Sequence, residues 1–333
     1  MGKSKRKKIV FSSVFAEKLE QFISYKRALG YKYSNEEIML ANFDRWCENQ
    51  GVSETNLKNE EASVWQNPRN GESPKSHSNR AILLGQFAKF LRTAGNGAYI
   101  VPTTVRIPQM TFVPHIFTGN ELTAMFRVID SMKESANLPH NREIYPMMFR
   151  LLYGCGLRVS EVSSLRKTDV DCENGIITVL GSKGDVDRLT PMSELLTVRM
   201  RAYMQKMKYL VPNTQYVFPN RIGENIAEVS IYSRFRDILF EAGIPHYGRG
   251  KGPRLHDFRH TFAVHSMQKM AEEGMDLYCA LPILSAYLGH NNVSSTEKYL
   301  RLTEEMHGKL LTQVLEKHGD IVPFAGKEVR LEN

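Results

Sequence analysis

Residues 154–165 read G-C-G-L-R-V-S-E-V-S-S-L, and residues 256–265 read H-D-F-R-H-T-F-A-V-H. In the first segment, Arg158 follows a glycine turn at the predicted start of a helix, where backbone N–H groups and a guanidinium can bind an anion together. In the second segment, His256 and Arg259 are three residues apart, which places them on one face of a helix. Either pattern alone is common in purely structural helices. A site is indicated only where further reactive residues accompany both.

The sequence around these two segments predicts a mainly helical unit with one small antiparallel β-hairpin. T-x-x-E at residues 118–121 is a capping box, which marks the start of the unit. Apolar residues at helical spacing predict further helices at 144–152, 160–165, 193–209, 229–242, 256–269, 281–288 and 303–317. Two short β runs, 175–180 and 187–190, flank a turn that carries Lys183 near its tip. We therefore expect an α+β domain with a lysine on its hairpin.

The sequence before residue 95 predicts a separate all-helical bundle. Its helices are expected at 14–29, 34–51, 56–65 and 76–93. The second of them opens with Ser34 and Glu37, the spacing of a capping box. From 95 to 117 the helical period is lost and three prolines interrupt an extended stretch, which is typical of a linker. We predict domains at 1–98 and 118–333, joined by a linker at 99–117.

The positive charge is concentrated in the N-terminal third of the chain. The net charge is +8, and residues 1–115 hold 17 basic and 10 acidic side chains, whereas residues 116–333 hold 27 and 26. A basic module attracts a polyanion, either a nucleic acid or an anionic membrane surface, and the lysine-rich start could also be a solvated tail. We favour nucleic acid and expect phosphate contacts on the polar side of the 76–93 helix, from Lys75, Arg80, Lys89 and Arg92.

Composition excludes several classes of protein. The chain has 333 residues, of which 42% are hydrophobic and 24% charged, as in a soluble globular protein with two domains. No apolar run approaches the roughly 18 to 20 residues of a membrane span, and the basic N-terminus lacks the apolar segment of a secretory signal. We therefore expect a cytoplasmic protein that makes no membrane contact.

A zinc site is the rival interpretation of the second segment. His256 and His260 have the spacing of the two histidines in H-E-x-x-H, with Asp257 in the place of the glutamate. Arg259 would put a fixed positive charge beside the metal, and no other segment offers an obvious third ligand. The four cysteines form no C-x-x-C pair. We therefore expect neither a metal nor another cofactor.

Two further features complete the pattern. L-G-H at residues 288–290 is followed nine residues after its histidine by a tyrosine, in T-E-K-Y. The arginine, the hairpin lysine, H-x-x-R, G-H and the tyrosine, in this order, resemble the tyrosine recombinase (phage integrase) family over most of 118–318. The resemblance implies that the N-terminal bundle is a core-binding (SAM-like) DNA-binding domain. It implies a catalytic set of Arg158, Lys183, His256, Arg259, His290 and Tyr299.

The chemistry of these residue types fits the breaking and rejoining of a DNA phosphodiester. A tyrosine hydroxyl can form a reversible covalent bond, here a 3′-phosphotyrosine at Tyr299. Two guanidinia, Arg158 and Arg259, can bind the negative charge of the transition state bidentately. Lys183 is the candidate general acid and His256 the candidate base. The remaining member, His290, would donate a hydrogen bond to the phosphate, and neither metal nor ATP is needed because the phosphotyrosine conserves the bond energy.

The expected function is site-specific recombination of double-stranded DNA, most simply the integration and excision of a mobile element such as a transposon or prophage. The family resemblance also implies a homotetramer on two DNA sites, held together by the C-terminal helix 303–317. Two alternatives stay open. One is a type IB topoisomerase-like relaxer, and the other is a sequence-specific DNA-binding regulator on the same scaffold.

Overall fold

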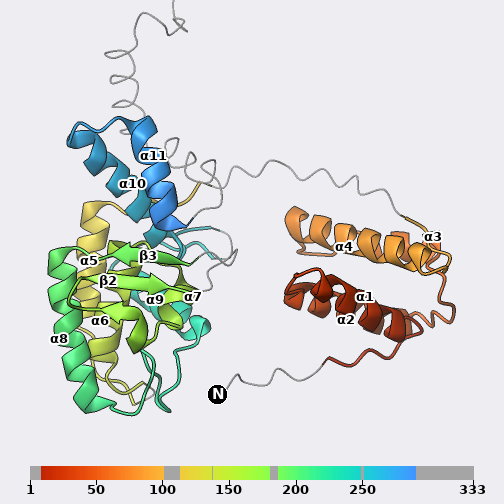
Figure 1. The fold of residues 1–333 in the computed structure, drawn as a ribbon, viewed down its shortest axis with the longest axis horizontal. Coiled ribbons are helices and arrows are strands. Elements are labelled where there is room, and N and C mark those ends of the chain that lie inside the picture. The colour runs from red at the N-terminus through yellow and green to blue at the C-terminus, as the bar shows by residue number, and fades with distance from the viewer. Residues whose placement is uncertain (1–8, 101–112, 137, 181–186, 249–250, 290–333) are drawn as a thin grey trace, which may run out of the picture. The chain divides into compact units, whose positions relative to one another are not determined.

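The computed structural model describes residues 9–100, 113–136, 138–180, 187–248 and 251–289. The chain divides into two compact units, residues 1–112 and 113–333 (Figure 1). The predicted fold class, mainly helical with a small antiparallel sheet, is confirmed. Within the described ranges, no helix combines the length and the hydropathy that a membrane span requires.

The first unit is a helical bundle with an aromatic core. Phe87 lies at its centre, with its ring centroid 5.5 to 6.1 Å from those of Phe15, Phe22 and Phe43. These four rings are almost fully buried, and rings at such distances add attraction beyond the burial of their area. The helices of this unit are α1 (Ala16–Ala28), α2 (Ser34–Asn49), α3 (Asn59–Gln66) and α4 (Pro74–Thr93).

The start of α2 differs from the prediction. Ser34 and Glu37 form no capping box, because the residue before the helix is Tyr33, in the left-handed region at φ 49°, and no side chain caps the helix. Glu37 instead accepts a hydrogen bond of 2.7 Å from Arg27. Helix α4 begins at Pro74, two residues before the predicted start, and the hydroxyl of Ser73 caps it by accepting a hydrogen bond from the backbone N–H of Ser76.

The second unit places helices around a three-stranded antiparallel sheet of order β1-β2-β3. Strand β1 is too short to give a sequence pattern and was not predicted. The register of β2 and β3 runs from the pair Ile176 and Pro191 to the pair Val179 and Arg188. The elements are α5 (Gly119–Asp130), α6 (Asn141–Gly154), α7 (Val159–Ser163), β1 (Val170–Asp171), β2 (Ile176–Val179), β3 (Arg188–Pro191), α8 (Glu194–Leu210), α9 (Glu228–Glu241), α10 (Asp257–Glu272) and α11 (Leu277–Leu288).

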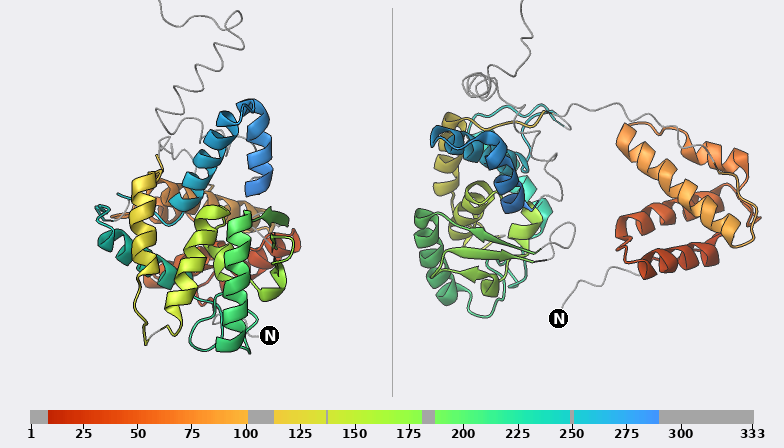
Figure 2. Two further views of the ribbon diagram at one scale, coloured as in Figure 1. Left: turned by 90° about the vertical axis from the view of Figure 1, so that its left-hand side faces the viewer. Right: turned by 45° about the horizontal axis from the view of Figure 1, so that its top comes forward.

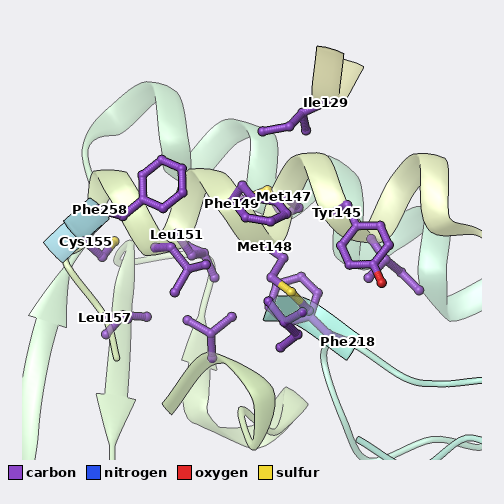
Figure 3. Close-up of a cluster of buried hydrophobic side chains, with 14 of the residues drawn as sticks. Ile129, Tyr145, Met147, Met148, Phe149, Leu151, Cys155, Leu157, Phe218 and Phe258 are labelled. Carbon is purple, nitrogen blue, oxygen red and sulfur yellow. The ribbon is translucent and has the colours of Figure 1, made fainter. Parts of the chain in front are cut away.

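Helix α6 is the centre of the second core. It packs against α5, α8 and α10, and Figure 2 shows α5, α6 and α8 side by side. Figure 3 shows side chains of α6 among Ile129 of α5, Phe258 of α10 and Phe218, which lies between α8 and α9. A smaller apolar cluster joins α10 to α11. Helix α10 therefore packs against both α6 and α11.

The predicted linker, 99–117, is too long at both ends. Phe117 is fully buried in the second core, and its backbone N–H donates to the hydroxyl of Thr261 over 3.0 Å. At the other end, the backbone N–H of Tyr99 donates to the carbonyl of Leu57 in the first unit over 2.8 Å. These hydrogen bonds join residues far apart in the sequence, so no local pattern of apolar residues reveals them. The sequence analysis therefore placed Tyr99 and Phe117 in the linker.

Candidate active site

The C-terminal end of α11 is the point at which the sequence segments meet. The helix ends at Gly289, which adopts a left-handed conformation at φ 65°. A Cβ atom at this position would lie 3.0 Å from Cδ of Arg188. Glycine is therefore required here both for the backbone conformation and for the approach of an arginine.

Three arginines bind three successive carbonyl groups at this helix end. Nε of Arg188 donates to the carbonyl of Tyr287 over 3.1 Å, and Nη2 of Arg158 donates to that of Gly289 over 3.4 Å. Nη2 of Arg259 donates to the carbonyl of Leu288. The last carbonyls of a helix have no partner within the helix and lie at the negative end of its dipole, so cations are stabilised there. The end of α11 thus brings together Arg158, Arg259 and the first two residues of the L-G-H motif, Leu288 and Gly289.

Arg259 is held between two segments. Its side chain is 1% exposed, and Nη1 donates to the carbonyl of Gly156 over 2.7 Å. Gly156 has φ 57°, and a Cβ atom there would lie 2.5 Å from the ring of Phe262 on α10. The second glycine of G-C-G-L-R is therefore needed to let the turn approach α10 and accept this hydrogen bond.

Arg158 is the residue that precedes α7, and its backbone is already engaged. Its N–H donates to Oε2 of Glu161 over 2.8 Å, and its Nη1 donates to Oε1 over 2.7 Å. The expectation of an anion bound by backbone N–H groups at this helix start is therefore not supported at Arg158 itself. A guanidinium has five N–H donors, so contacts to Glu161 and Gly289 leave others for a substrate phosphate.

Glu161 and Arg188 are parts of the site that the sequence analysis did not single out. Their side chains are each 6% exposed and form a bidentate pair, with Nη1 to Oε1 at 2.9 Å and Nη2 to Oε2 at 2.8 Å. Burial raises the pKa of Glu161, but hydrogen bonds from Arg188 and Arg158 outweigh it and lower the pKa to about 2. Glu161 stands three residues after Arg158, which is a visible signal. Arg188 arrives from β3, and no local pattern marks it.

The histidine segment forms the start of α10. His256 is exposed at the residue before the helix, and its ring lies 4.8 Å from that of His260, perpendicular to it. Asp257, which stands where H-E-x-x-H has its glutamate, is buried and accepts a hydrogen bond of 2.7 Å from the backbone of Arg254. Burial raises the pKa of this carboxyl. The residues that the structure describes contain no group of three potential metal ligands.

The sequence profile of the phage integrase family matches residues 117–306. The chain belongs to the phage integrase family. It is 36% identical over 193 residues to the tyrosine recombinase XerA of Pyrococcus furiosus, covering 57% of this chain and 58% of that one. It is 25% identical over 303 residues to y4rB of Sinorhizobium fredii, a provisionally named integrase/recombinase, covering 88% and 95%. The resemblance to tyrosine recombinases is thereby confirmed.

Solved structures show the same fold. The integrase of transposon Tn1549, in complex with transposon right end DNA, matches with a TM-score of 0.63 and 18% identity, over 91% of this chain and 99% of that chain. The XerH site-specific recombinase bound to its difH substrate matches with a TM-score of 0.60 and 21% identity, over 84% and 78%.

Three members of the predicted catalytic set, Lys183, His290 and Tyr299, lie outside the described residues, as does the predicted helix 303–317. Tyr287 is the nearest alternative nucleophile in the sequence. Its ring stacks on Phe262 at a centroid distance of 5.3 Å, and its hydroxyl donates to the carbonyl of Pro191 over 3.0 Å. Burial is the largest cause that raises its pKa. These contacts disfavour Tyr287 as a nucleophile in this member of the family.

The predicted DNA-contact residues on α4 separate into two kinds. Lys75, Lys89 and Arg92 are exposed. The prediction that Arg80 lies on the polar side is wrong, because its side chain is 4% exposed and pairs with Glu72 at 2.9 and 2.6 Å. It also donates to the carbonyl of Asn67 over 3.0 Å. Arg80 is therefore removed from the proposed phosphate contacts.

Proposed function

We propose that this chain is a site-specific tyrosine recombinase that cuts and rejoins double-stranded DNA. The observation that supports this most directly is the position of Arg158 and Arg259. They bind the carbonyls of Gly289 and Leu288, immediately before His290 in the sequence. Two guanidinia anchored to one helix end form a rigid cationic group, which is the requirement for stabilising charge that develops on a phosphate.

The proposed reaction has one covalent intermediate. The hydroxyl oxygen of Tyr299 attacks phosphorus and forms a 3′-phosphotyrosyl bond, while the bond to the 5′-oxygen breaks. His256 takes the phenolic proton, and Lys183 gives a proton to the departing oxygen. His290 donates a hydrogen bond to a nonbridging oxygen. The free 5′-hydroxyl of a second strand then attacks the phosphorus, and the bond to the oxygen of Tyr299 breaks. The reaction therefore consumes no ATP and requires no metal ion.

Integration and excision of a mobile element is the proposed biological role. y4rB supports it, because that relative matches over most of both chains and carries the name integrase/recombinase. We also propose that four copies assemble on two DNA sites through the segment 303–317, for which the sequence predicts a helix. Sequencing the DNA that flanks the gene tests the role, because an element of this kind is bounded by repeats. Measuring the mass of the complex on DNA tests the assembly.

The deciding experiment traps the covalent intermediate on a nicked suicide substrate. The wild-type chain is expected to form a protein–DNA adduct, also in excess EDTA, and Tyr299→Phe is expected to form none while it binds DNA normally. Tyr287→Phe is the matched control and should still form the adduct. An adduct in the Tyr299→Phe variant would overturn the assignment of the nucleophile. Loss of the wild-type adduct in EDTA, with recovery on addition of zinc, would favour the metal hypothesis.

The same substrates separate the two alternatives. Binding to a defined sequence without any adduct would identify a regulator. An adduct accompanied by relaxation of supercoiled DNA that lacks a defined site would identify a topoisomerase-like enzyme. A recombinase is expected to exchange strands only between paired sites.

A further inference from the structure

We propose that Arg188 is a positioning residue, which acts through Glu161 to hold Arg158 at the end of α11 in the arrangement that DNA cleavage needs; this inference rests on the proposed function. Arg188 begins β3, outside the predicted catalytic set. Its guanidinium donates hydrogen bonds to Glu161, which also binds Arg158, and to the carbonyl of Tyr287 in the last turn of α11.

Each nitrogen of the Arg188 guanidinium is engaged. Nη1 and Nη2 donate to the two oxygens of Glu161 over 2.9 and 2.8 Å, and Nε donates to the carbonyl of Tyr287 over 3.1 Å. The aliphatic part of the side chain packs against Gly289. A second contact between the same two elements joins the hydroxyl of Tyr287 to the carbonyl of Pro191. Arg188 is therefore fixed by protein groups, and its effect on a substrate must pass through another residue.

The hydrogen bonds of Glu161 indicate what Arg188 does. Oε1 accepts from Nη1 of Arg158 and Nη1 of Arg188, while Oε2 accepts from Nη2 of Arg188 and from the backbone of Arg158. A lone arginine beside a carboxylate favours two parallel hydrogen bonds to both oxygens. Arg188 takes that bidentate position, so Arg158 binds Glu161 through one nitrogen of its guanidinium and reaches Gly289 with another.

Loss of Arg188 should therefore misplace Arg158 rather than remove it. Glu161 would be left with one guanidinium partner, and a bidentate pair between them would turn Arg158 away from the carbonyl of Gly289. Lysine cannot replace Arg188, because an ammonium group lacks the planar fork that binds both carboxylate oxygens and the third acceptor together.

The first test compares Arg188→Lys with Arg150→Lys in the full chain. Arg150 is a matched control in the same unit, because it forms a bidentate pair with Asp130 at 2.8 and 2.7 Å and also donates to a backbone carbonyl, that of Pro146. At saturating protein, the rate of adduct formation should fall by roughly tenfold to a hundredfold in Arg188→Lys, which is less than the roughly hundredfold to thousandfold loss seen when a transition-state donor itself is removed. The Kd for DNA should stay within about twofold, and Arg150→Lys should change neither quantity by more than about twofold.

A double-mutant cycle separates positioning from simple stabilisation. If Arg188 acts through Arg158, adding Arg188→Lys to Arg158→Lys should slow the reaction by no more than about twofold, because coupled residues are not additive. The inference would be overturned if the rate loss of the double variant equalled the product of the two single losses. It would also be overturned if Arg188→Lys reacted as fast as the wild type. The rates are divided by the folded fraction from thermal unfolding, and Arg188→Gln replaces Arg188→Lys if the latter does not fold. A wild-type chain without any adduct would instead refute the proposed function.

Discussion

Glu161 shows how one buried carboxylate organises the cationic site. Burial opposes its negative charge, and the hydrogen bonds from Arg188 and Arg158 more than offset this, so its pKa falls from the ordinary 4.5 to about 2. A group whose pKa is lower in the folded state stabilises that state at pH values above its unfolded pKa. The stabilisation from Glu161 is therefore complete at neutral pH and is lost as the pH falls from about 4.5 to about 2.

We predict that Glu161→Gln lowers the free energy of unfolding of the second unit by about 3 to 5 kcal/mol at pH 7, because it leaves Arg188 buried without its carboxylate. Its unfolding should also depend less steeply on pH below about 4.5 than that of the wild type. Hydrogen exchange of the second unit measures both effects. The control is Glu143→Gln, which removes a more exposed pair with Lys206 and should cost less than about 1 kcal/mol. Equal stability of Glu161→Gln and the wild type would contradict this account.

The residue scale also shows what a sequence can reveal about this site. Arg158 and Arg259 were predictable because each stands in a local motif, and Glu161 stands in the same motif as Arg158. Arg188 was not predictable, because its role depends on how β3 lies against α11, a contact between residues about a hundred positions apart. The hydrogen bond between Tyr99 and Leu57 of the first unit was not predicted for the same reason, because it joins residues distant in the sequence.

At the scale of an element, the basic residues of α4 lie in two different environments, because Arg80 is buried and Lys89 is exposed. Arg80 precedes Leu84, Phe87 and Leu91 by four, seven and eleven residues, which is the spacing of one helix face. These three apolar residues are buried, so the sequence did contain the signal that Arg80 faces the core. Lys89 lies on the opposite face and is exposed. Counting all basic residues of a helix as one polar side was therefore the error.

We predict opposite effects of two substitutions on α4. Lys89→Gln should weaken binding to all DNA sequences alike and lower the slope of log K against log salt by about 0.9, without loss of stability. Arg80→Ala should leave that slope unchanged and destabilise the first unit by about 3 to 5 kcal/mol, because it leaves Glu72 without its buried partner. Fluorescence reports this unfolding selectively, since both tryptophans of the chain, Trp46 and Trp65, belong to the first unit. A lower salt slope for a stable Arg80→Ala protein would contradict the structural role.

At the scale of the whole molecule, charge and chemistry are divided between the two units. Residues 1–112 contain the same 17 basic and 10 acidic side chains as residues 1–115, a net charge of +7 out of +8. The motif residues all belong to the second unit, whose core includes Phe117 and needs no side chain from the first. Each unit has its own apolar core. The proposed division is that the first unit supplies DNA affinity and the second supplies cleavage.

We therefore predict that a chain of residues 113–333 folds but binds DNA orders of magnitude more weakly than the full chain. Replacing the three exposed residues that we propose as phosphate contacts should by itself lower the slope of log K against log salt by about 2.7, at about 0.9 for each phosphate; they are Lys75, Lys89 and Arg92. Circular dichroism checks that the shortened chain is helical, and titrations at several salt concentrations give both slopes. At very high protein concentration the shortened chain should still form the adduct on the suicide substrate, because the arginines at the end of α11 are intact. Equal affinities and equal slopes for the two chains would show that the charge of the first unit serves only solubility or protein contacts, and the proposal that this unit supplies DNA affinity would have to be abandoned.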